Sequence, residues 1–222
     1  MIDNFGELTK SVLIGSDATP VRERFLQEYA SEVEDFISNM ESAFIHWAKV
    51  APDFEADMGG AHVSALVYGS LATHVTSMKL FLEGLMIPAG NAQRYVLESI
   101  AMALLAANPS LGFRERYARG EYSTSKAIRD LKRNAKRLGI SSGGAQQLDD
   151  HSKLYDQYSH PTLLTLASLM TLRELESKTV FGSVFDDGKK AAYDREIRSR
   201  VSLASVLPNY IEGVHDNFRS TA

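Results

Sequence analysis

Apolar side chains recur every three or four residues over most of this chain, and this spacing limits its fold more than any other feature. The first such stretch begins after Thr19 and Pro20, an N-cap residue and a proline at the first helical position, and extends to Pro52. Its apolar positions are Phe25, Tyr29, Val33, Phe36, Met40, Phe44 and Trp47. Residues with this spacing share one face of an α-helix, whereas no segment keeps the two-residue alternation of a half-buried strand. The fold class is therefore predicted to be all-α.

Prolines and glycines divide the rest of the chain into further helical segments. Long helices are predicted between Val63 and Leu85, from Pro88 to Ala107 and from Lys189 to about Phe218, the last with a kink at Pro208. Shorter helices are predicted at residues 111–118, 124–138, 148–158 and 162–176. Residues 179–188, TVFGSVFDDG, are the only β-like segment, and a short β-hairpin is an alternative there.

The helices are expected to belong to one domain, because no internal repeat, low-complexity tract or long linker separates them. We therefore predict a single domain over residues 1–222, a multi-helix bundle in which long helices pack antiparallel. Residues 60–175 are assigned to the core of the bundle and residues 1–18 to a mobile N-terminal segment. A homodimer is the expected assembly, since most soluble oligomers are symmetric pairs.

Composition and motifs exclude several kinds of site. The chain contains no cysteine, which excludes disulfides, thiolate zinc sites and a cysteine nucleophile. It also lacks a glycine-rich phosphate loop, a dinucleotide fingerprint, a nucleophile elbow and paired metal-binding histidines. No cofactor and no metal site are therefore expected. The one alternative is a metal site assembled from the distant residues His74, Glu98 and His160.

The chain is expected to be cytoplasmic, without a membrane partner. Residues 1–15 mix charged with isolated apolar residues and lack the basic start and apolar run of a secretory signal. The most apolar stretch, residues 87–107, contains Arg94 and Glu98, so it is not the uninterrupted apolar run of a spanning helix.

Arg94 and Glu98 introduce two charges into a helix that is otherwise apolar nearly all round. At 100° per residue they fall in the same arc as Leu97, Ala101 and Leu105, so both are predicted to point into the bundle. Their spacing of four residues allows them to pair. The pair is either an internal ion pair that fixes helix register, or part of a pocket in which Arg94 binds an anion and Glu98 acts as a base.

Tyr155, Tyr158 and His160 add further polar groups to this candidate cluster. The two tyrosines are three residues apart on one helical face, so their rings are expected near the core, with hydroxyls that need partners. His160 precedes Pro161, which forces an extended backbone there. Its imidazole is expected either to cap the next helix or to extend toward a neighbouring one.

The run Arg94-Tyr-Val-Leu-Glu98 and, some sixty residues later, the run Tyr155-Asp-Gln-Tyr158-Ser-His160-Pro161 carry a family resemblance. Over residues 60–175 they resemble a group of bacterial all-helical proteins related to HEPN-like bundles, which are often linked to abortive-infection or toxin-antitoxin systems. Active HEPN ribonucleases carry an arginine followed, after four to six residues, by a histidine. None of the six histidines of this chain has an arginine five to seven positions before it. The resemblance therefore implies a helical bundle without ribonuclease activity.

Positive charge is concentrated in one segment of an otherwise acidic chain. The formal net charge is -4, but residues 114–137 hold nine cations against three acids, a local net of +6 that leaves -10 for the remainder. In the helix predicted at residues 124–138, six cations project within an arc of about 140°. They are Lys126, Arg129, Lys132, Arg133, Lys136 and Arg137. The opposite side is apolar and is formed by Ala127, Ile128, Leu131, Ala135 and Leu138.

This cationic face has three interpretations. It is a solvated surface, a site for the phosphate backbone of nucleic acid, or a contact for an acidic partner. The acidic partner could be another protein or the acidic N-terminal helix of this chain, which carries Glu28, Glu32, Glu34, Asp35 and Glu41.

Three functional hypotheses follow from these features. The first is a non-catalytic binding or regulatory module that engages nucleic acid or an acidic protein through the cationic face. The second is an enzyme with a pocket inside the bundle, where Arg94 orients a small anionic substrate and Glu98, Tyr158 or His160 transfers protons. The third is an interaction subunit in which the polar cluster only stabilises the fold.

Overall fold

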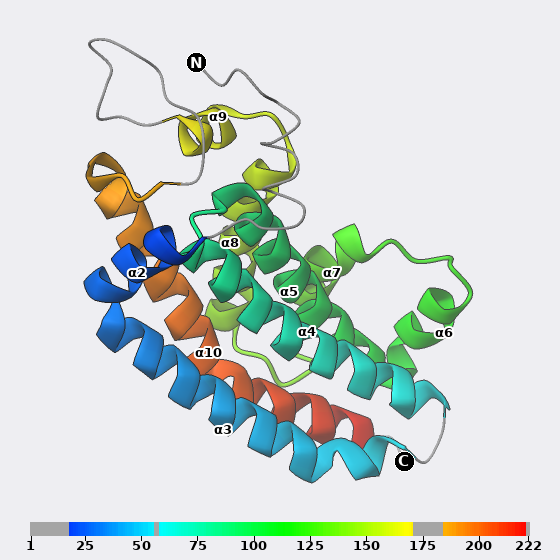
Figure 1. The fold of residues 1–222 in the computed structure, drawn as a ribbon. Coiled ribbons are helices and arrows are strands. Elements are labelled where there is room, and N and C mark those ends of the chain that lie inside the picture. The colour runs from blue at the N-terminus through cyan, green and yellow to red at the C-terminus, as the bar shows by residue number, and fades with distance from the viewer. Residues whose placement is uncertain (1–17, 56–57, 171–183, 221–222) are drawn as a thin grey trace, which may run out of the picture.

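A computed structural model describes residues 18–55, 58–170 and 184–220, and every structural statement below concerns these residues. They form an all-α multi-helix bundle, as predicted (Figure 1). The four longest helices are α3 (Ala30–Phe54), α4 (Met58–Leu82), α5 (Met86–Ala107) and α10 (Lys190–Arg219). The shorter ones are α2 (Thr19–Glu28), α6 (Phe113–Ala118), α7 (Ala127–Asn134), α8 (Ser142–Asp156) and α9 (Leu163–Leu169).

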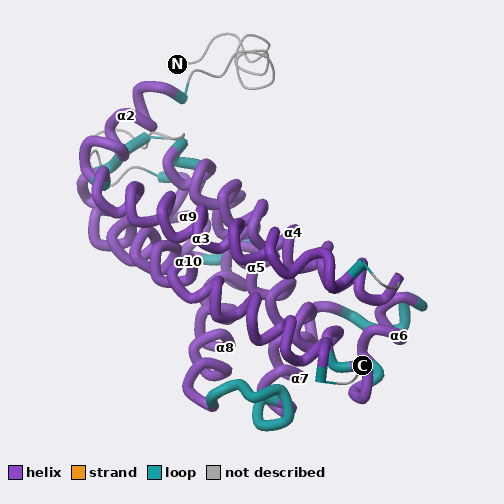
Figure 2. The backbone as a smooth tube through the Cα atoms, turned by 90° about the horizontal axis from the view of Figure 1, so that it is seen from below, coloured by secondary structure: helices purple, strands orange, loops and turns teal. Residues whose placement is uncertain are grey.

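The four long helices pack around a common core. α4 packs along α5, and α3 packs along α10 and α4. Figure 2 shows α7 and α8 on one side of the long helices, where both pack against α5. The buried apolar side chains form one core cluster that extends along the chain from Phe25 to Val214. None of the helices in the described ranges is long and apolar enough to cross a membrane.

α5 is the central helix, which is the position that its sequence predicts. Every side chain from Ser99 to Ala107 is buried, as are Val96 and Leu97. A helix that is apolar on all sides is stable only when neighbours cover all of them. α4 and α10 pack on it together with the shorter helices α7 and α8.

The N-terminal helical stretch was predicted to be one helix, but it forms two, α2 and α3. The chain breaks at Tyr29, whose φ of -126° and ψ of 31° are not helical. Its ring lies 6.3 Å from that of Phe25, and its hydroxyl donates a 2.7 Å hydrogen bond to Asp194 on α10. This contact with a distant helix coincides with the break. α3 ends at Phe54, two residues after Pro52 and close to the predicted end, and α10 runs through Pro208 as one helix, as predicted.

Three predicted segments fall partly outside the described residues. Residues 1–17 of the N-terminal segment and residues 179–183 of the alternative hairpin are among them. The described part of the hairpin segment contains no strand, because residues 184–186 are irregular and Asp187–Lys189 form a 3₁₀ turn. α9 ends at Leu169, because Met170 has an extended backbone with a φ of -102° and a ψ of 143°, so the helix predicted at residues 162–176 is shorter than predicted; residues 171–176 lie outside the described residues.

Candidate anion-binding site

α7 divides into a buried apolar side and an exposed cationic side, as its sequence predicts. Ala127, Ile128 and Leu131 are buried, and Ala135 and Leu138 continue the buried side beyond the helix. All six predicted cations are exposed: Lys126, Arg129, Lys132, Arg133, Lys136 and Arg137. Burial of the apolar side therefore positions the cations at the surface.

A surface groove of about 470 Å³ lies between the cationic side of α7 and the segment that connects α6 to it. Four cations line this groove, namely Arg116, Lys126, Arg129 and Arg133. Two acids, Glu121 and Asp130, also line it. Both acids are in ion pairs: Glu121 with Arg119 at 2.9 Å, and Asp130 with Arg133 at 3.4 Å. The groove is thus a predominantly positive depression.

Aromatic contacts hold one wall of the groove. The guanidinium of Arg116 lies 4.5 Å from the centre of the Phe113 ring and 5.3 Å from that of Tyr122. The two rings pack edge to face with their centres 5.1 Å apart. Such cation–π contacts hold a guanidinium in place while leaving its charge uncompensated. α6 can begin here because Gly112 adopts a φ of 65°, which glycine reaches without strain.

Asp130 orients the arginines that flank it. Its carboxylate accepts a 2.9 Å hydrogen bond from the Tyr122 hydroxyl and lies 3.6 Å from Arg129 and 3.4 Å from Arg133. Burial and the charge of Asp130 raise the pKa of Tyr122, which stays protonated as a donor. The side chain of Asp130 is only 16% exposed, whereas those of Arg129 and Arg133 are 56% and 68% exposed. Solvent therefore meets the arginines rather than the acid between them.

Two of the remaining cations of α7 have partners on neighbouring segments. Lys132 pairs with Asp149 on α8 at 3.1 Å, and Lys153 pairs with the same carboxylate at 2.9 Å. Hydrogen bonds from these two lysines lower the pKa of Asp149. Arg137 donates a 2.9 Å hydrogen bond to the Ser110 hydroxyl.

The acidic N-terminal helix does not neutralise this face within the described residues. Among its acids, Glu28 instead pairs with Lys190 and lies 3.8 Å from Arg24. The intramolecular partner considered from the sequence is therefore not observed, and the cationic face of α7 stays open to solvent.

Arg94 and Glu98 form the predicted pair, with 3.0 Å between Arg94 Nε and Glu98 Oε1. The two side chains were predicted to point into the bundle, but they are 27% and 19% exposed, so the pair lies at the margin of the bundle. The reason is that Arg94 also binds Asp156 at 3.0 Å and the Ser159 hydroxyl at 2.7 Å, which draws it toward the end of α8. The cavity beside Glu98 measures about 40 Å³, room for a few water molecules at most.

Tyr155 and Tyr158 are buried as predicted, but they meet a different pair of charges. Their hydroxyls lie 3.2 Å and 3.4 Å from the carboxylate of Glu196 on α10, which pairs with Arg200 at 2.7 Å. Burial raises the pKa of Tyr155 to about 12 and also raises that of Tyr158. Both tyrosines therefore stay protonated and serve as hydrogen-bond donors to Glu196.

His74 extends this buried network. Its Nε2 lies 3.0 Å from the carbonyl oxygen of Arg200, and its Nδ1 lies 3.0 Å from the side-chain amide of Gln93. Arg200 in turn donates a 3.1 Å hydrogen bond to the Ser77 hydroxyl, which is also 3.0 Å from Gln93. Burial, together with the charge of Arg200, lowers the pKa of His74 to about 4, so the ring is neutral at pH 7.

The neutral state of His74 determines how the network is connected. A neutral imidazole donates once, and Nε2 faces a carbonyl, so Nε2 carries the proton and Nδ1 accepts. The Gln93 amide must then present its nitrogen to Nδ1, an orientation that its two similar ends allow. In this arrangement both ring nitrogens of His74 have a partner. The network joins α4, α5, α8 and α10 and is closed to solvent, which is the geometry of a structural network.

The sequence hypotheses did not include Glu196 and Arg200. The signal was present, because Tyr193, Ile197, Arg200 and Ala204 follow the apolar period of α10. An arginine within an apolar stripe has to be paired in the folded state. The charged surroundings of Arg200, in the run Asp194 to Arg200, concealed this signal.

His160 does not join either cluster. It has the extended backbone expected before Pro161, with a φ of -131° and a ψ of 153°, and its side chain is exposed. The carbonyl oxygen of His160, and not its imidazole, accepts a hydrogen bond from the Thr165 hydroxyl at the start of α9. His74, Glu98 and His160 therefore lie apart, and the described part of the chain contains no group of three potential metal ligands.

Comparison with known proteins gives no match to a protein-family model, to a curated protein or to a solved structure.

Proposed function

We propose that this protein is a non-catalytic binding module that engages the phosphate backbone of nucleic acid through the cationic side of α7 and the groove beside it. The observation that carries this proposal is the groove, whose lining holds four cations against two acids and exposes Arg129 and Arg133 by more than half. A solvated surface usually mixes both signs of charge, whereas here the exposed side of a helix presents one sign.

The arrangement of the cations favours a linear polyanion. The six cations follow one another along α7 and the turns at its two ends, with Lys126 before the helix and Lys136 and Arg137 after it. Three of the six cations are arginines, whose planar guanidinium binds phosphate in a bidentate manner. Contacts of this kind position a nucleic acid without reading its sequence, so we expect binding with little base specificity.

The geometry gives less support to an enzyme. The cavity at Glu98 is too small for an anionic substrate, and the buried network around Arg200 is closed to solvent. The resemblance to HEPN-like bundles and the cytoplasmic location stay predictions. The all-α bundle is compatible with the resemblance.

Titration of the full chain with labelled duplex DNA and single-stranded RNA at several salt concentrations tests the proposed function. We expect binding to both, weakening steeply with salt, and loss of binding when Arg129, Arg133 and Lys136 are changed to Glu. The proposal fails if neither nucleic acid binds, or if binding is indifferent to salt and to these substitutions. Binding of polyglutamate in preference to nucleic acid would instead identify an acidic protein as the partner.

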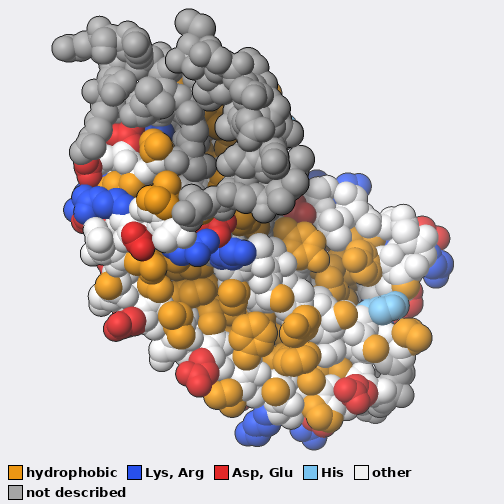
Figure 3. Space-filling view, in the orientation of Figure 1, with side chains coloured by type: hydrophobic (Ala, Val, Ile, Leu, Met, Phe, Trp, Pro, Cys, Tyr) orange, Lys and Arg blue, Asp and Glu red, His pale blue; other side chains and the backbone are white. Residues whose placement is uncertain are grey.

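We also propose that the molecule forms a homodimer through α4 and its neighbours. α4 carries one charged side chain, Lys79, along its 25 residues, although one of its sides is exposed. Tyr68 and Val75 on this side are 48% and 42% exposed, and Tyr95 on α5 is 52% exposed. Figure 3 shows hydrophobic side chains gathered over this region with few charges among them. A contiguous apolar surface of this kind is typical of an interface, and a two-fold pair closes it.

A further inference from the structure

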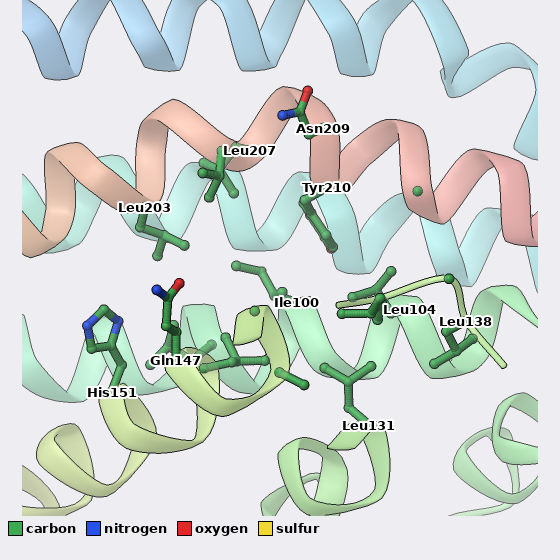
Figure 4. Close-up of a pocket in the computed structure, with 18 of the residues that line it drawn as sticks. Ile100, Leu104, Leu131, Leu138, Gln147, His151, Leu203, Leu207, Asn209 and Tyr210 are labelled. Atoms are coloured by element: carbon green, nitrogen blue, oxygen red, sulfur yellow. The ribbon is translucent and has the colours of Figure 1, made fainter. Parts of the chain in front are cut away.

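α8 and α10 diverge from a common point. At one end they are joined by the hydrogen bonds of Tyr155 and Tyr158 to Glu196. Toward the N-terminus of α8 they separate, because α8 packs there on α5 and α7. A cavity of about 410 Å³ lies between the separated helices, with α5 and α7 beneath it (Figure 4).

The lining of this cavity contains no Asp, Glu, Lys or Arg, although 23% of the chain is charged. Most of the surface is aliphatic, and the side chains labelled in Figure 4 include Ile100, Leu104, Leu131, Leu138, Leu203 and Leu207. Leaving this much apolar surface in contact with water is unfavourable, at about 25 cal/mol for each Å². An apolar occupant would remove that cost.

Two of the polar side chains of the lining belong to α8 and lie at one end, whereas Asn209 and Tyr210 lie on α10. Gln147 and His151 are one turn apart on α8, and Figure 4 shows both at the same end of the cavity. Neither side chain forms a hydrogen bond with another residue in the described ranges of the chain. The Gln147 amide offers both a donor and an acceptor, and the His151 imidazole offers two ring nitrogens for hydrogen bonds.

The volume limits the size of an occupant. An apolar cavity of about 150 Å³ is known to hold benzene, so 410 Å³ corresponds to roughly 16 non-hydrogen atoms. The volume also falls within the range of about 300–1,000 Å³ typical of small-molecule sites. A chain of about ten carbons fits a space of this size.

We propose that this cavity is a binding site for a small neutral amphipathic molecule with an apolar chain and an uncharged hydrogen-bonding head. The chain lies among the leucines of α5, α7 and α10, and the head binds Gln147 and His151. A neutral head is favoured because the lining has no cation to pair with a carboxylate and no acid to pair with an amine. The site lies on the buried side of α7, opposite the cationic face, so it is independent of nucleic-acid binding.

Calorimetric titration of the full chain with decanamide tests the proposal, with sodium decanoate as the charged counterpart of equal chain length. We expect one decanamide per chain and binding at least tenfold weaker for decanoate. Leu203→Trp fills the cavity and is expected to weaken decanamide binding at least tenfold. Ser205→Trp is the matched control, because it adds the same ring to an exposed position of the same helix outside the lining.

A second variant tests the contribution of the ligand's polar head separately from that of its apolar chain. Gln147→Leu combined with His151→Leu keeps the cavity apolar but removes the hydrogen-bonding groups that bind the head, and it is expected to weaken decanamide binding at least tenfold. Circular dichroism and light scattering confirm that each variant keeps its fold and its mass. The proposal is overturned if decanamide does not bind, if Leu203→Trp binds it as tightly as the unaltered protein, or if decanoate binds more tightly. A change in molecular mass on Leu203→Trp would also overturn it, by identifying this surface as an interface between copies of the chain.

Discussion

The cationic side of α7 makes a quantitative prediction about salt dependence. Its six cations include two that lie beside Asp130 and one that pairs with Asp149. Six cations less these two acids leave four uncompensated charges. If each neutralises one phosphate, the logarithm of duplex DNA affinity falls with that of the salt concentration with a slope of about -3.6. Raising the salt from about 50 to 200 mM should then weaken binding roughly 150-fold.

Removing two arginines should halve that dependence. In Arg129→Gln/Arg133→Gln two uncompensated charges remain, so the slope becomes about -1.8 and the same salt change weakens binding only about 12-fold. Both side chains are more than half exposed, so we expect the fold to be unaffected. Fluorescence anisotropy with a labelled duplex of about twenty base pairs measures the slope over this range.

A matched variant distinguishes this face from the overall charge of the protein. Arg195→Gln/Arg198→Gln changes the net charge by the same amount at exposed positions of α10. Its slope should equal that of the unaltered protein. If the α7 variant leaves the slope unchanged, or if the α10 variant lowers it equally, the assignment of the binding face is wrong.

Four further predictions concern the core and the assembly. A Cβ at Gly90 would lie 2.4 Å from the Tyr158 ring. Gly90→Ala should therefore lower the free energy of unfolding, measured by urea denaturation, by about 1–3 kcal/mol. An unchanged free energy of unfolding would mean that the ring has room to move. Glu196→Ala leaves Arg200 buried without its partner and should lower the free energy of unfolding by about 3–5 kcal/mol. The control is Glu83→Ala, which removes an ion pair with the half-exposed Arg22 and should lower it by about 1 kcal/mol or less. The pKa of His74 is about 4 in the fold and 6.5 when unfolded, so its contribution to stability is complete above pH 6.5 and falls by about 3 kcal/mol as the pH approaches 4. His74→Gln should flatten stability between pH 6.5 and 4, and an unchanged pH profile would contradict the assignment. Tyr68→Glu/Val75→Glu should halve the mass measured by light scattering, and a monomeric unaltered protein would refute the dimer.

The features predicted correctly are those that depend on neighbouring residues along the chain. The apolar period of residues 88–107 predicts a central helix, and α5 is that helix. The spacing of Arg94 and Glu98 predicts their ion pair, and the alternation of charge on residues 124–138 predicts the exposed cationic side. Each follows from the geometry of one helix, which is the same in any tertiary context.

The features that were missed depend on contacts between distant segments. The helix break at Tyr29 coincides with a hydrogen bond to Asp194, which is 165 residues away. The hydroxyls of Tyr155 and Tyr158 meet Glu196, and His74 meets Arg200, across separations of 38 to 126 residues. The cavity between α8 and α10 likewise depends on how two helices diverge.

The amino-acid sequence by itself determined that this chain is helical, which helix is central, and where its positive charge is exposed. These properties follow from periodicity and composition, because burial of one side of a helix requires apolar residues at fixed intervals. Only the tertiary structure decided which polar groups meet in the core, that Arg94 lies at the margin of the bundle, and that an uncharged cavity remains between two helices. The angles at which helices pack depend on the fit of many side chains at once, and no single segment contains that information.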